Sequence, residues 1–401
     1  MRGYGIPQAA FAAECMADDL ALALRMDHWN SGKELHEPGY VDPHTHVKCN
    51  TYGLAECMEK GREFIRWDEK RREYENQTGP CERESEMAIF CYKTGVYPIS
   101  LETASCRMIL NQDGSMQLQM GATEIGQGAD TVFTQMAAEV TGITEDKVNV
   151  LSTQDTDVSP FDTGAYASRQ TYVSGMAVKK TGAIFKEKIL DYAAYMLEKP
   201  QDTLDVRDNH IVDKETGTQL LPMEELATTA FYSLDRSVHI TAEATSHCKT
   251  NTFATGVCFA EVEVDMPLGK VKVTNIVNVH DSGKLINPKL AAAQVHGGMS
   301  MGLGYGLSEE LLFDAKGRPL NDNLLDYKLP TAMDTPDLNA LFVELDDPTG
   351  PFGNKALGEP PAIPVAPAVR NAVLNATGVA VDSLPMDPQK MVKHFKEAGL
   401  I

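Results

Sequence analysis

Clusters of basic residues are absent from this chain of 401 residues, whose formal net charge is -21 and whose pI is near 4.9. Nucleic acids and anionic membranes are bound through stripes of Lys and Arg that contact phosphates, so the composition argues against either partner. A long uninterrupted apolar run is missing too, because Glu14, Asp18 and Asp19 break the apolar stretch near the start. That stretch fits neither a signal peptide nor a membrane-spanning helix, and we expect a cytoplasmic protein.

The cysteines never fall in CxxC spacing; they stand at positions 15, 49, 57, 81, 91, 106, 248 and 258. Iron-sulfur, zinc-ribbon and thioredoxin-type sites need that spacing, so we expect reduced and mainly structural thiols. His44, His46 and Cys49 come close together in "DPHTHVKC" and could bind a metal, but a fourth ligand at a suitable spacing is missing. A surface loop is the simpler interpretation.

The chain has 43% hydrophobic residues, enough for a globular protein of two or three domains. Its first part predicts a helix from Pro7 to Leu24, an irregular segment at 27–50, and a second, highly charged helix that ends at Gly79. Near residue 95 the pattern changes to strands. We therefore expect a domain boundary there, which divides the chain into 1–95 and 96–401.

Two hairpins are expected in the second part. Asp113-Gly114 predicts a tight turn that places Met108 and Leu110 opposite Met116, Leu118 and Met120. Apolar residues alternate again on both sides of Pro267-Leu268-Gly269, at Cys258, Ala260, Val262, Val264, Val271 and Val273. Helices at about 130–141, 168–198 and 288–306 are interleaved with these strands, so the predicted fold class is α+β with mixed sheets.

Three glycine-dense joints interrupt this framework. At the first, Gly126-Gln127-Gly128 leads into a helix, where free N–H groups and the Gln127 amide could hold an anionic or polar group of a cofactor. An ordinary turn before a helix fits this spacing equally well. At the second, Ala167-Ser168-Arg169-Gln170 opens a long helix for which Ser168 would serve as N-cap.

The third joint is a helix with glycines at 297, 298, 302, 304 and 306 and one amide, Gln294. Its Gly302-Leu303-Gly304-Tyr305-Gly306 is not a dinucleotide fingerprint, because no strand precedes it. Small residues here are expected to let another backbone or a planar ligand approach closely.

The segment "KALGEPP" places one carboxylate, Glu359, between Gly358 and two prolines, with the apolar run "AIPVAPAV" behind it. A glutamate in such a rigid turn is either a solvated loop residue or a carboxylate whose direction and basicity are set for chemistry. The segment alone leaves both interpretations open.

Taken in order, several segments resemble the molybdopterin-binding subunit of the xanthine dehydrogenase family, and most nearly bacterial purine-type members. They are "MRGYGIPQ", "TEIGQGADT", "STQDTDVSPFDTGAYASRQ", "VHDSGKLINP", "QVHGGMSMGLG", "LLDYKLPT" and the final "EAGLI", so that the resemblance covers essentially the whole chain. It implies that 1–95 is the remainder of a first molybdenum-cofactor-binding domain and 96–401 the second.

The resemblance also implies an activity, the hydroxylation of a purine such as hypoxanthine or xanthine with oxygen from water. The cofactor would be molybdenum on a pyranopterin, with oxo, sulfido and hydroxide ligands, in either the mononucleotide or the cytosine dinucleotide form. Hydride would pass to the sulfido ligand, and iron-sulfur clusters and FAD on partner subunits would carry the electrons onward.

Site residues follow from the resemblance position by position. Glu359 matches the catalytic base, which would take the proton of the attacking hydroxide. Arg2 and Ala167 match residues whose backbone approaches the molybdenum, and Tyr4 matches an aromatic that packs on the substrate ring. Positions that match pyranopterin contacts are Gly126, Gln127, Gly128, Ala167, Ser168, Arg169, Gln170, Gln294 and Gly358. The hydroxyl of Tyr4, and Met1 where the family often has an aromatic, depart from the pattern.

Family members carry several hundred residues before their RGYG-type segment, including a glutamine at the apical oxo ligand and a GGFGG-type loop. We expect a separate polypeptide to supply this first half, as in members with a split subunit, so that the chain would be inactive alone; a truncated gene product is the alternative. Two other hypotheses remain. One is a non-catalytic remnant or assembly scaffold, and the other a related hydroxylase of aldehydes or of N-heterocycles such as nicotinate.

Overall fold

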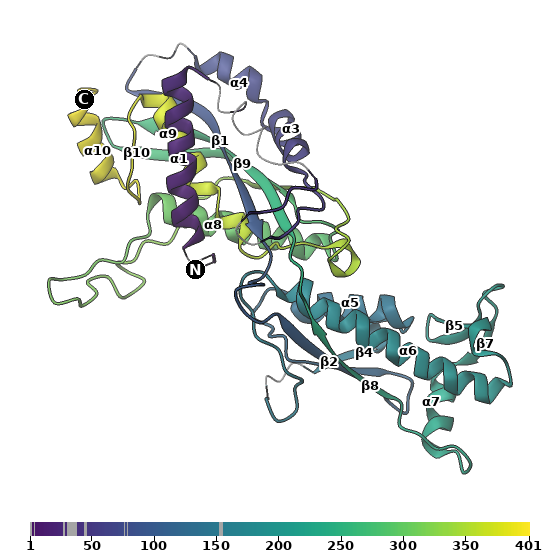
Figure 1. The fold of residues 1–401 in the computed structure, drawn as a ribbon. Coiled ribbons are helices and arrows are strands. Elements are labelled where there is room, and N and C mark those ends of the chain that lie inside the picture. Colours follow the sequence, from purple (N-terminus) through teal and green to yellow (C-terminus); the bar gives the residue numbers. More distant parts are fainter. Residues whose placement is uncertain are drawn as a thin grey trace. The chain divides into compact units, whose positions relative to one another are not determined.

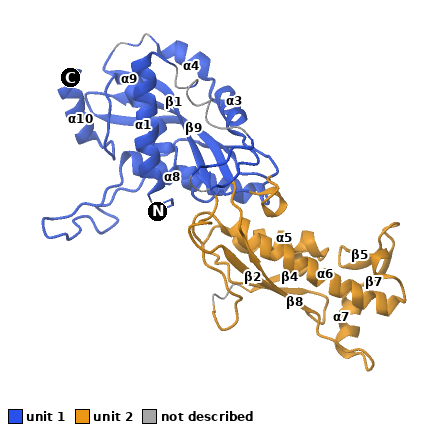
Figure 2. Ribbon diagram, viewed as in Figure 1, with its two compact units in different colours: residues 1–93, 253–346, 355–401 blue, residues 94–252, 347–354 orange. Residues whose placement is uncertain are grey.

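The computed structural model describes residues 2–3, 5–26, 29, 38–43, 46–75, 77, 79–151 and 155–401. They form two compact units, coloured separately in Figure 2. Unit 1 consists of residues 1–93, 253–346 and 355–401, and unit 2 of residues 94–252 and 347–354. The chain thus leaves unit 1 near the expected boundary at residue 95 and returns to it at residue 253. The division into family domains at 1–95 and 96–401 is a separate matter and stays a prediction.

Unit 1 is built on a four-stranded sheet in the order β1-β9-β10-β11. Its strands are β1 (Cys81–Lys93), β9 (Phe253–Asp265), β10 (Lys270–Asp281) and β11 (Leu338–Val343). β9 runs antiparallel to both β1 and β10, and β11 is parallel to β10. β9 and β10 form the hairpin that the alternation around Pro267-Leu268-Gly269 predicted, which is confirmed.

Helices cover both faces of this sheet (Figure 1). They are α1 (Ile6–Leu24), α3 (Leu54–Ile65), α4 (Trp67–Tyr74), α8 (Pro288–Leu307), α9 (Val365–Thr377) and α10 (Pro388–Glu397). Because successive side chains of a strand point to opposite faces, β9 contributes to two cores. Cys258, Ala260 and Val262 pack with α8, α9 and α10, whereas Val257 and Phe259 pack with α3 and Trp67.

The single charged helix expected before Gly79 is in fact two helices, and that prediction was wrong. Arg66 separates α3 from α4 with a left-handed backbone, φ 60°. Ile65 and Trp67 are both buried, yet residues two apart point to nearly opposite sides of one continuous helix. The break lets both side chains reach the core.

Unit 2 contains a four-stranded sheet in the order β4-β3-β2-β8 and a three-stranded sheet, β5-β6-β7. Its strands are β2 (Thr103–Leu110), β3 (Met116–Met120), β4 (Val148–Leu151), β5 (Leu204–Arg207), β6 (His210–Asp213), β7 (Gln219–Pro222) and β8 (Thr241–His247), and its helices are α5 (Ala129–Thr141), α6 (Gly175–Leu197) and α7 (Met223–Tyr232). β2 and β3 form the predicted hairpin, with Leu110 opposite Met116 and Met108 opposite Leu118. The α+β class with mixed sheets is confirmed.

The expected helix at 168–198 begins with a π-helical turn, Gln170–Ser174, that continues into α6. Its N-cap residue is Arg169 and no side chain caps it, so the N-cap role expected for Ser168 was wrong. Among the described residues no helix is both long enough and apolar enough to cross a membrane.

Candidate functional site

Glu359 lies at the start of a short helical turn in unit 1, Pro360–Ala362, and its carbonyl accepts the N–H of Ala362 at 3.1 Å. The glycine-rich face of α8 allows this turn to pack closely. A Cβ built on Gly298 would lie 2.5 Å from Cβ of Pro361, and one on Gly302 would lie 2.5 Å from Cβ of Val365. The glycines therefore let the backbone of the Glu359 turn approach α8 closely, which is one of the two roles expected for them. The turn is thereby held against a rigid helix.

The Glu359 carboxylate is hydrogen-bonded by the hydroxyl of Tyr92, which donates to Oε2. Tyr92 is the next-to-last residue of β1 and is buried beside Phe90, Ala356 and Ile363. Analysis of the sequence did not identify this residue. The available signal was an aromatic side chain at the end of an apolar strand, which usually indicates only core packing.

Arg2 connects two further predicted positions. Its Nη1 donates to the carbonyl oxygens of Gln294 at 2.8 Å and of Gly358 at 3.0 Å. Burial lowers the pKa of the guanidinium, which nevertheless remains charged. The expectation for Arg2 concerned its backbone, whereas the structure assigns its side chain the role of holding the residue before Glu359 against α8.

The Gln294 side chain is half-buried and forms no hydrogen bond within the described part of the chain. A half-buried amide without partners can donate two hydrogen bonds and accept two. The Gln294 amide is therefore available to a polar ligand beside the second turn of α8, where Arg2 also binds.

A buried ion pair fixes the start of the Glu359 segment. Nζ of Lys355 lies 2.7 Å from Oδ2 of Asp281, and both side chains are fully buried. Asp281 also accepts the N–H of Gly53 at 3.0 Å, and the Lys355 N–H donates to the carbonyl of Ser282 at 2.8 Å. The segment that carries Glu359 is thus tied to the end of β10, a role for Lys355 that the sequence did not reveal.

In unit 2, the first glycine joint is organised around Glu124. Its carboxylate accepts the N–H groups of Gly126 at 2.7 Å, Gly128 at 3.1 Å and Asp130 at 3.1 Å. Burial acts to raise the pKa of Glu124, but these hydrogen bonds outweigh it and the pKa is lowered. The expectation that free N–H groups gather at this joint was wrong, because an internal carboxylate already occupies them.

The amides of Gln127 and Gln170 lie together. Nε2 of Gln127 donates to Oε1 of Gln170 at 2.7 Å, and both Nε2 atoms donate to the carbonyl of Thr123, at 2.8 and 3.1 Å. Oε1 of Gln127 accepts the N–H of Ile125 at 2.7 Å. Within the described residues this leaves one N–H of Gln170 and one lone pair on each amide oxygen for a ligand.

Ala167 and Ser168 both have left-handed backbones, with φ 46° and 50°. Such conformations cost about 1 to 3 kcal/mol each in residues other than glycine and occur where the surroundings enforce them. The N–H of Gly95 donates to the carbonyl of Ala167 at 2.9 Å, and the Ala167 N–H makes no hydrogen bond within the described residues. The loop thus presents the Ala167 N–H as a hydrogen-bond donor in a fixed position, without a partner among the described residues.

The buried side chain of Arg169 stabilises the left-handed conformation of Ala167 and Ser168. Its buried guanidinium donates to Glu102 at 2.5 Å, Asp162 at 2.6 Å, Gly164 O at 2.9 Å and Thr103 O at 2.8 Å. Nearly all of its donors are used, so the side chain is not available to a ligand. We therefore describe Arg169 as a positioning residue for the preceding loop.

Among the predicted site residues, the structure gathers Arg2, Gln294, Gly358 and Glu359 in unit 1 and the group from Gly126 to Gln170 in unit 2. Tyr4, expected on the substrate ring, lies outside the described residues, as does His44 of the metal site considered above. His46 is exposed and Cys49 is buried. In the described part of the chain, no three His, Cys, Asp or Glu side chains cluster as metal ligands.

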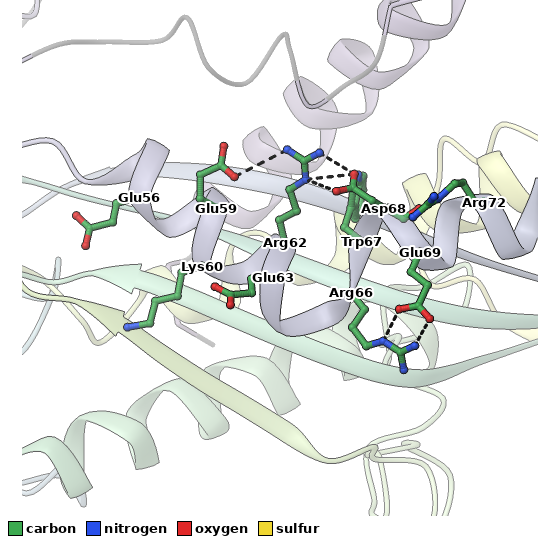
Figure 3. A pocket seen from close by; sticks show the side chains of 10 residues that line it. All are labelled: Glu56, Glu59, Lys60, Arg62, Glu63, Arg66, Trp67, Asp68, Glu69 and Arg72. Atoms are coloured by element: carbon green, nitrogen blue, oxygen red, sulfur yellow. Dashed lines mark hydrogen bonds and ion pairs between the residues drawn. The ribbon is translucent and has the colours of Figure 1, made fainter.

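A surface hollow of about 800 Å³ lies over α3 and α4 of unit 1 (Figure 3). It is lined by Glu56, Glu59, Lys60, Arg62, Glu63, Arg66, Trp67, Asp68, Glu69 and Arg72. Its charged groups pair with one another, as Arg62 does with Asp68 at 2.7 Å. None of the predicted site residues lies in this hollow, and Arg62 and Arg66 are already paired with carboxylates there.

Comparison with known proteins assigns the chain to a protein family. Residues 60–336 match the family described as "Molybdopterin cofactor-binding domain", and the chain belongs to that family. It is 47% identical over its whole length to the "Xanthine dehydrogenase molybdenum-binding subunit" of Escherichia coli O157:H7, and covers 54% of that protein. It is 31% identical to "Probable hypoxanthine oxidase XdhD" of Escherichia coli strain K12, over 98% of this chain and 41% of that protein. The resemblance to the xanthine dehydrogenase family is confirmed.

A solved structure shares the fold. "Reconstituted CO dehydrogenase from Oligotropha carboxidovorans" superimposes with a TM-score of 0.88 at 24% identity, over 98% of this chain and 52% of that one. The chain thus spans about half the length of the relatives it matches.

The residues present fit a molybdopterin cofactor. The group is a polar ring system that carries its own metal, so the protein needs to supply hydrogen bonds rather than metal ligands. Each unit, taken by itself, has such groups: the Gln294 amide in unit 1, and the Ala167 N–H and the remaining N–H of Gln170 in unit 2. Gly126 adds space, since nothing lies within 4 Å of a Cβ built there.

Proposed function

We propose that this chain forms part of the molybdenum-binding subunit of a xanthine dehydrogenase-type hydroxylase that acts on a purine such as hypoxanthine or xanthine. The observation that carries the proposal is the 47% identity, along the whole chain, to the xanthine dehydrogenase molybdenum-binding subunit of Escherichia coli. The reaction adds oxygen from water to a ring carbon and releases two protons and two electrons.

When bound, the molybdopterin cofactor supplies the redox centre that takes up the two electrons. Glu359 accepts the proton that the attacking, water-derived oxygen loses. The carboxylate suits this role because the Pro360–Ala362 turn fixes its backbone and Tyr92 fixes its direction. Arg2 holds Gly358 and so restrains the residue before the base.

The pterin is held by amides and backbone groups. We propose that the side-chain amides of Gln294, Gln127 and Gln170 bind the pterin. Gly126 and Gly128, whose N–H groups are bound by Glu124, would allow its close approach. Ala167 and Ser168 contribute backbone groups, and Arg169 acts through them. We also propose that Tyr4 packs on the substrate ring.

We further propose that the rest of the subunit, iron-sulfur clusters and FAD are supplied by parts of the complex outside this sequence. This is supported by the fraction of the relatives that the chain covers, 54% of the Escherichia coli subunit. Whether the cofactor is the mononucleotide or the cytosine dinucleotide form is decided by analysis of the nucleotide released on denaturation.

The test is a substrate panel on the protein purified as its native complex, with metal analysis. We expect molybdenum in the complex and oxidation of hypoxanthine and xanthine, with the new oxygen labelled from isotopic water. Turnover of aldehydes or nicotinate in place of purines would contradict the substrate assignment. A complex without molybdenum and without hydroxylase activity would identify a scaffold instead.

A further inference from the structure

Residues 309–336, here called the arm, connect α8 to β11 and extend away from the rest of unit 1 as a long loop, coloured green in Figure 1. Large apolar side chains of the arm face solvent. Leu324 and Leu325 are each 80% exposed and Met333 is 92% exposed. Leu311, Phe313 and Leu320 are also exposed. So many exposed apolar side chains in one segment are unusual for a surface loop and indicate a surface that is covered in the assembled protein.

The arm has a defined shape of its own because its polar groups bond internally. Oδ1 of Asn321 accepts the N–H of Leu312 at 2.8 Å, and its Nδ2 donates to the carbonyl of Glu310 at 2.6 Å. Asp314 accepts the N–H groups of Lys316 and Arg318. Polar groups thus shape the arm while apolar groups point outward, the reverse of an ordinary solvated loop. A preorganised surface of this kind binds a partner with a small entropy cost.

We propose that the arm docks onto the remaining portion of the molybdenum-binding subunit, the part of the relatives that this chain does not match. This rests on the proposed function. The chain aligns along its whole length, arm included, with a relative of which it covers 54%, so proteins that share this half possess a further portion of similar size. An exposed apolar surface on one half is where such a portion can pack.

Charge argues against a second copy of this chain as the occupant. The chain carries a formal net charge of -21, so two copies repel each other. Within the arm, the acidic residues Glu309, Glu310, Asp314, Asp322, Asp326 and Asp334 outnumber the basic residues Lys316, Arg318 and Lys328. The partner surface is therefore apolar and bordered by basic side chains.

The experiment uses the protein as it occurs in its own complex, with the photo-cross-linking amino acid p-benzoylphenylalanine in place of Leu324. The matched control carries it in place of Leu234, which is fully exposed in unit 2. After irradiation, we expect position 324 to cross-link to peptides of the remaining portion, on the same polypeptide or on another. Cross-links to a second copy of this chain or to another protein, or a yield no higher than at position 234, would overturn the proposal.

A second measurement places the cross-linker at Met333 and tests the apolar contact itself. Because burying one leucine side chain favours association by more than a factor of about ten, Leu324→Asp with Leu325→Asp lowers the cross-link yield from position 333 at least tenfold. The control substitution Leu234→Asp leaves that yield unchanged. An unchanged yield in the double variant would refute docking through the arm.

Molybdenum content and purine oxidation are measured on the same preparations. A complex that is loaded and active but shows no cross-link from the arm would refute the docking proposal alone. Cross-links in a complex that lacks molybdenum would refute the proposed function.

Discussion

The hydroxyl of Tyr92 donates a hydrogen bond to the Glu359 carboxylate, and so links the end of β1 to a turn near the end of the chain. One carboxylate oxygen is thereby directed by the protein core.

Glu359→Gln keeps the shape of the side chain but removes its ability to accept a proton. We expect kcat for purine oxidation to fall by about 10² to 10⁴-fold, the usual contribution of a general base, while the molybdenum content stays at the wild-type value. Steady-state kinetics with metal analysis measures both. Glu397→Gln, on the exposed face of α10, serves as the control and leaves both quantities unchanged. A fully loaded Glu359→Gln variant with wild-type kcat would remove Glu359 from the mechanism.

Tyr92→Phe removes the hydroxyl and leaves the ring in the core. A lost hydrogen bond to a charged group costs about 1.5 to 3 kcal/mol, so we expect kcat to fall roughly ten- to a hundredfold. KM changes little, because Tyr92 positions the carboxylate rather than the substrate. The control is Tyr232→Phe, at an exposed position of α7. If KM rose and kcat stayed constant, the role assigned to Tyr92 would be wrong.

Lys355→Met leaves Asp281 charged and buried without its partner. Removal of one member of a buried pair costs about 3 to 5 kcal/mol, which we expect as a loss of unfolding free energy in denaturant titrations. Adding Asp281→Asn restores part of that loss because the unpaired charge is gone. As the control, Arg66→Ala breaks a solvent-exposed pair with Glu69, and we expect the unfolding free energy to stay unchanged. Equal stability of Lys355→Met and the wild type would show that the pair is dispensable.

Ala167→Gly relieves a left-handed backbone that alanine tolerates poorly. We expect the unfolding free energy to rise by about 1 kcal/mol, while cofactor retention falls because the loop loses its fixed shape. Gel filtration followed by metal analysis reports retention. Ala165→Gly, two residues earlier in the same loop and without a positive φ, should not stabilise the protein. Tighter cofactor retention in Ala167→Gly would contradict the proposal that the fixed shape of the Ala167–Ser168 loop helps to hold the cofactor.

Glu124 predicts a pH dependence. Its folded-state pKa is lowered, so its contribution is fully present above the unfolded-state pKa of about 4.5 and is lost as pH falls through the lower, folded value. Glu124→Gln therefore reduces stability at pH 7 by about 1 kcal/mol, as loss of a helix cap does, and flattens the stability profile below pH 4.5. Thermal unfolding between pH 3 and pH 7 tests this. An unaltered profile in the variant would show that the carboxylate does not cap the joint.

The parts of the fold that could be predicted are those in which apolar residues alternate along a strand and turn residues mark its end. Met108, Leu118 and the Asp113-Gly114 turn define a hairpin locally, so its register followed from the sequence. The break at Arg66 could not be foreseen, because it arises from two side chains, Ile65 and Trp67, that the tertiary core requires on one side.

The candidate site shows the same limit. Glu359 and the glutamines stand in recognisable segments, and the family resemblance predicts site roles for them, which stay predictions. Tyr92 and Lys355 meet their partners across long stretches of sequence, and no local pattern distinguishes them from ordinary core and loop residues. Glu124 is close to its partners in the sequence, only two residues before Gly126. Its position in the motif did not reveal that its carboxylate binds the N–H groups of the joint.

Because the chain returns to unit 1 only at residue 253, the sheet of unit 1 is completed late during synthesis. β1 is complete at Lys93, but its partner β9 emerges from the ribosome only after the whole of residues 94–252. Closing a long loop costs little more than closing a moderate one, about 0.6 kcal/mol for each doubling, so the insertion is compatible with a stable sheet. The order of events is nevertheless constrained. Most of unit 2 is available to fold while β1 still exposes an unpaired apolar edge, and during that interval chaperones would be expected to bind the nascent chain.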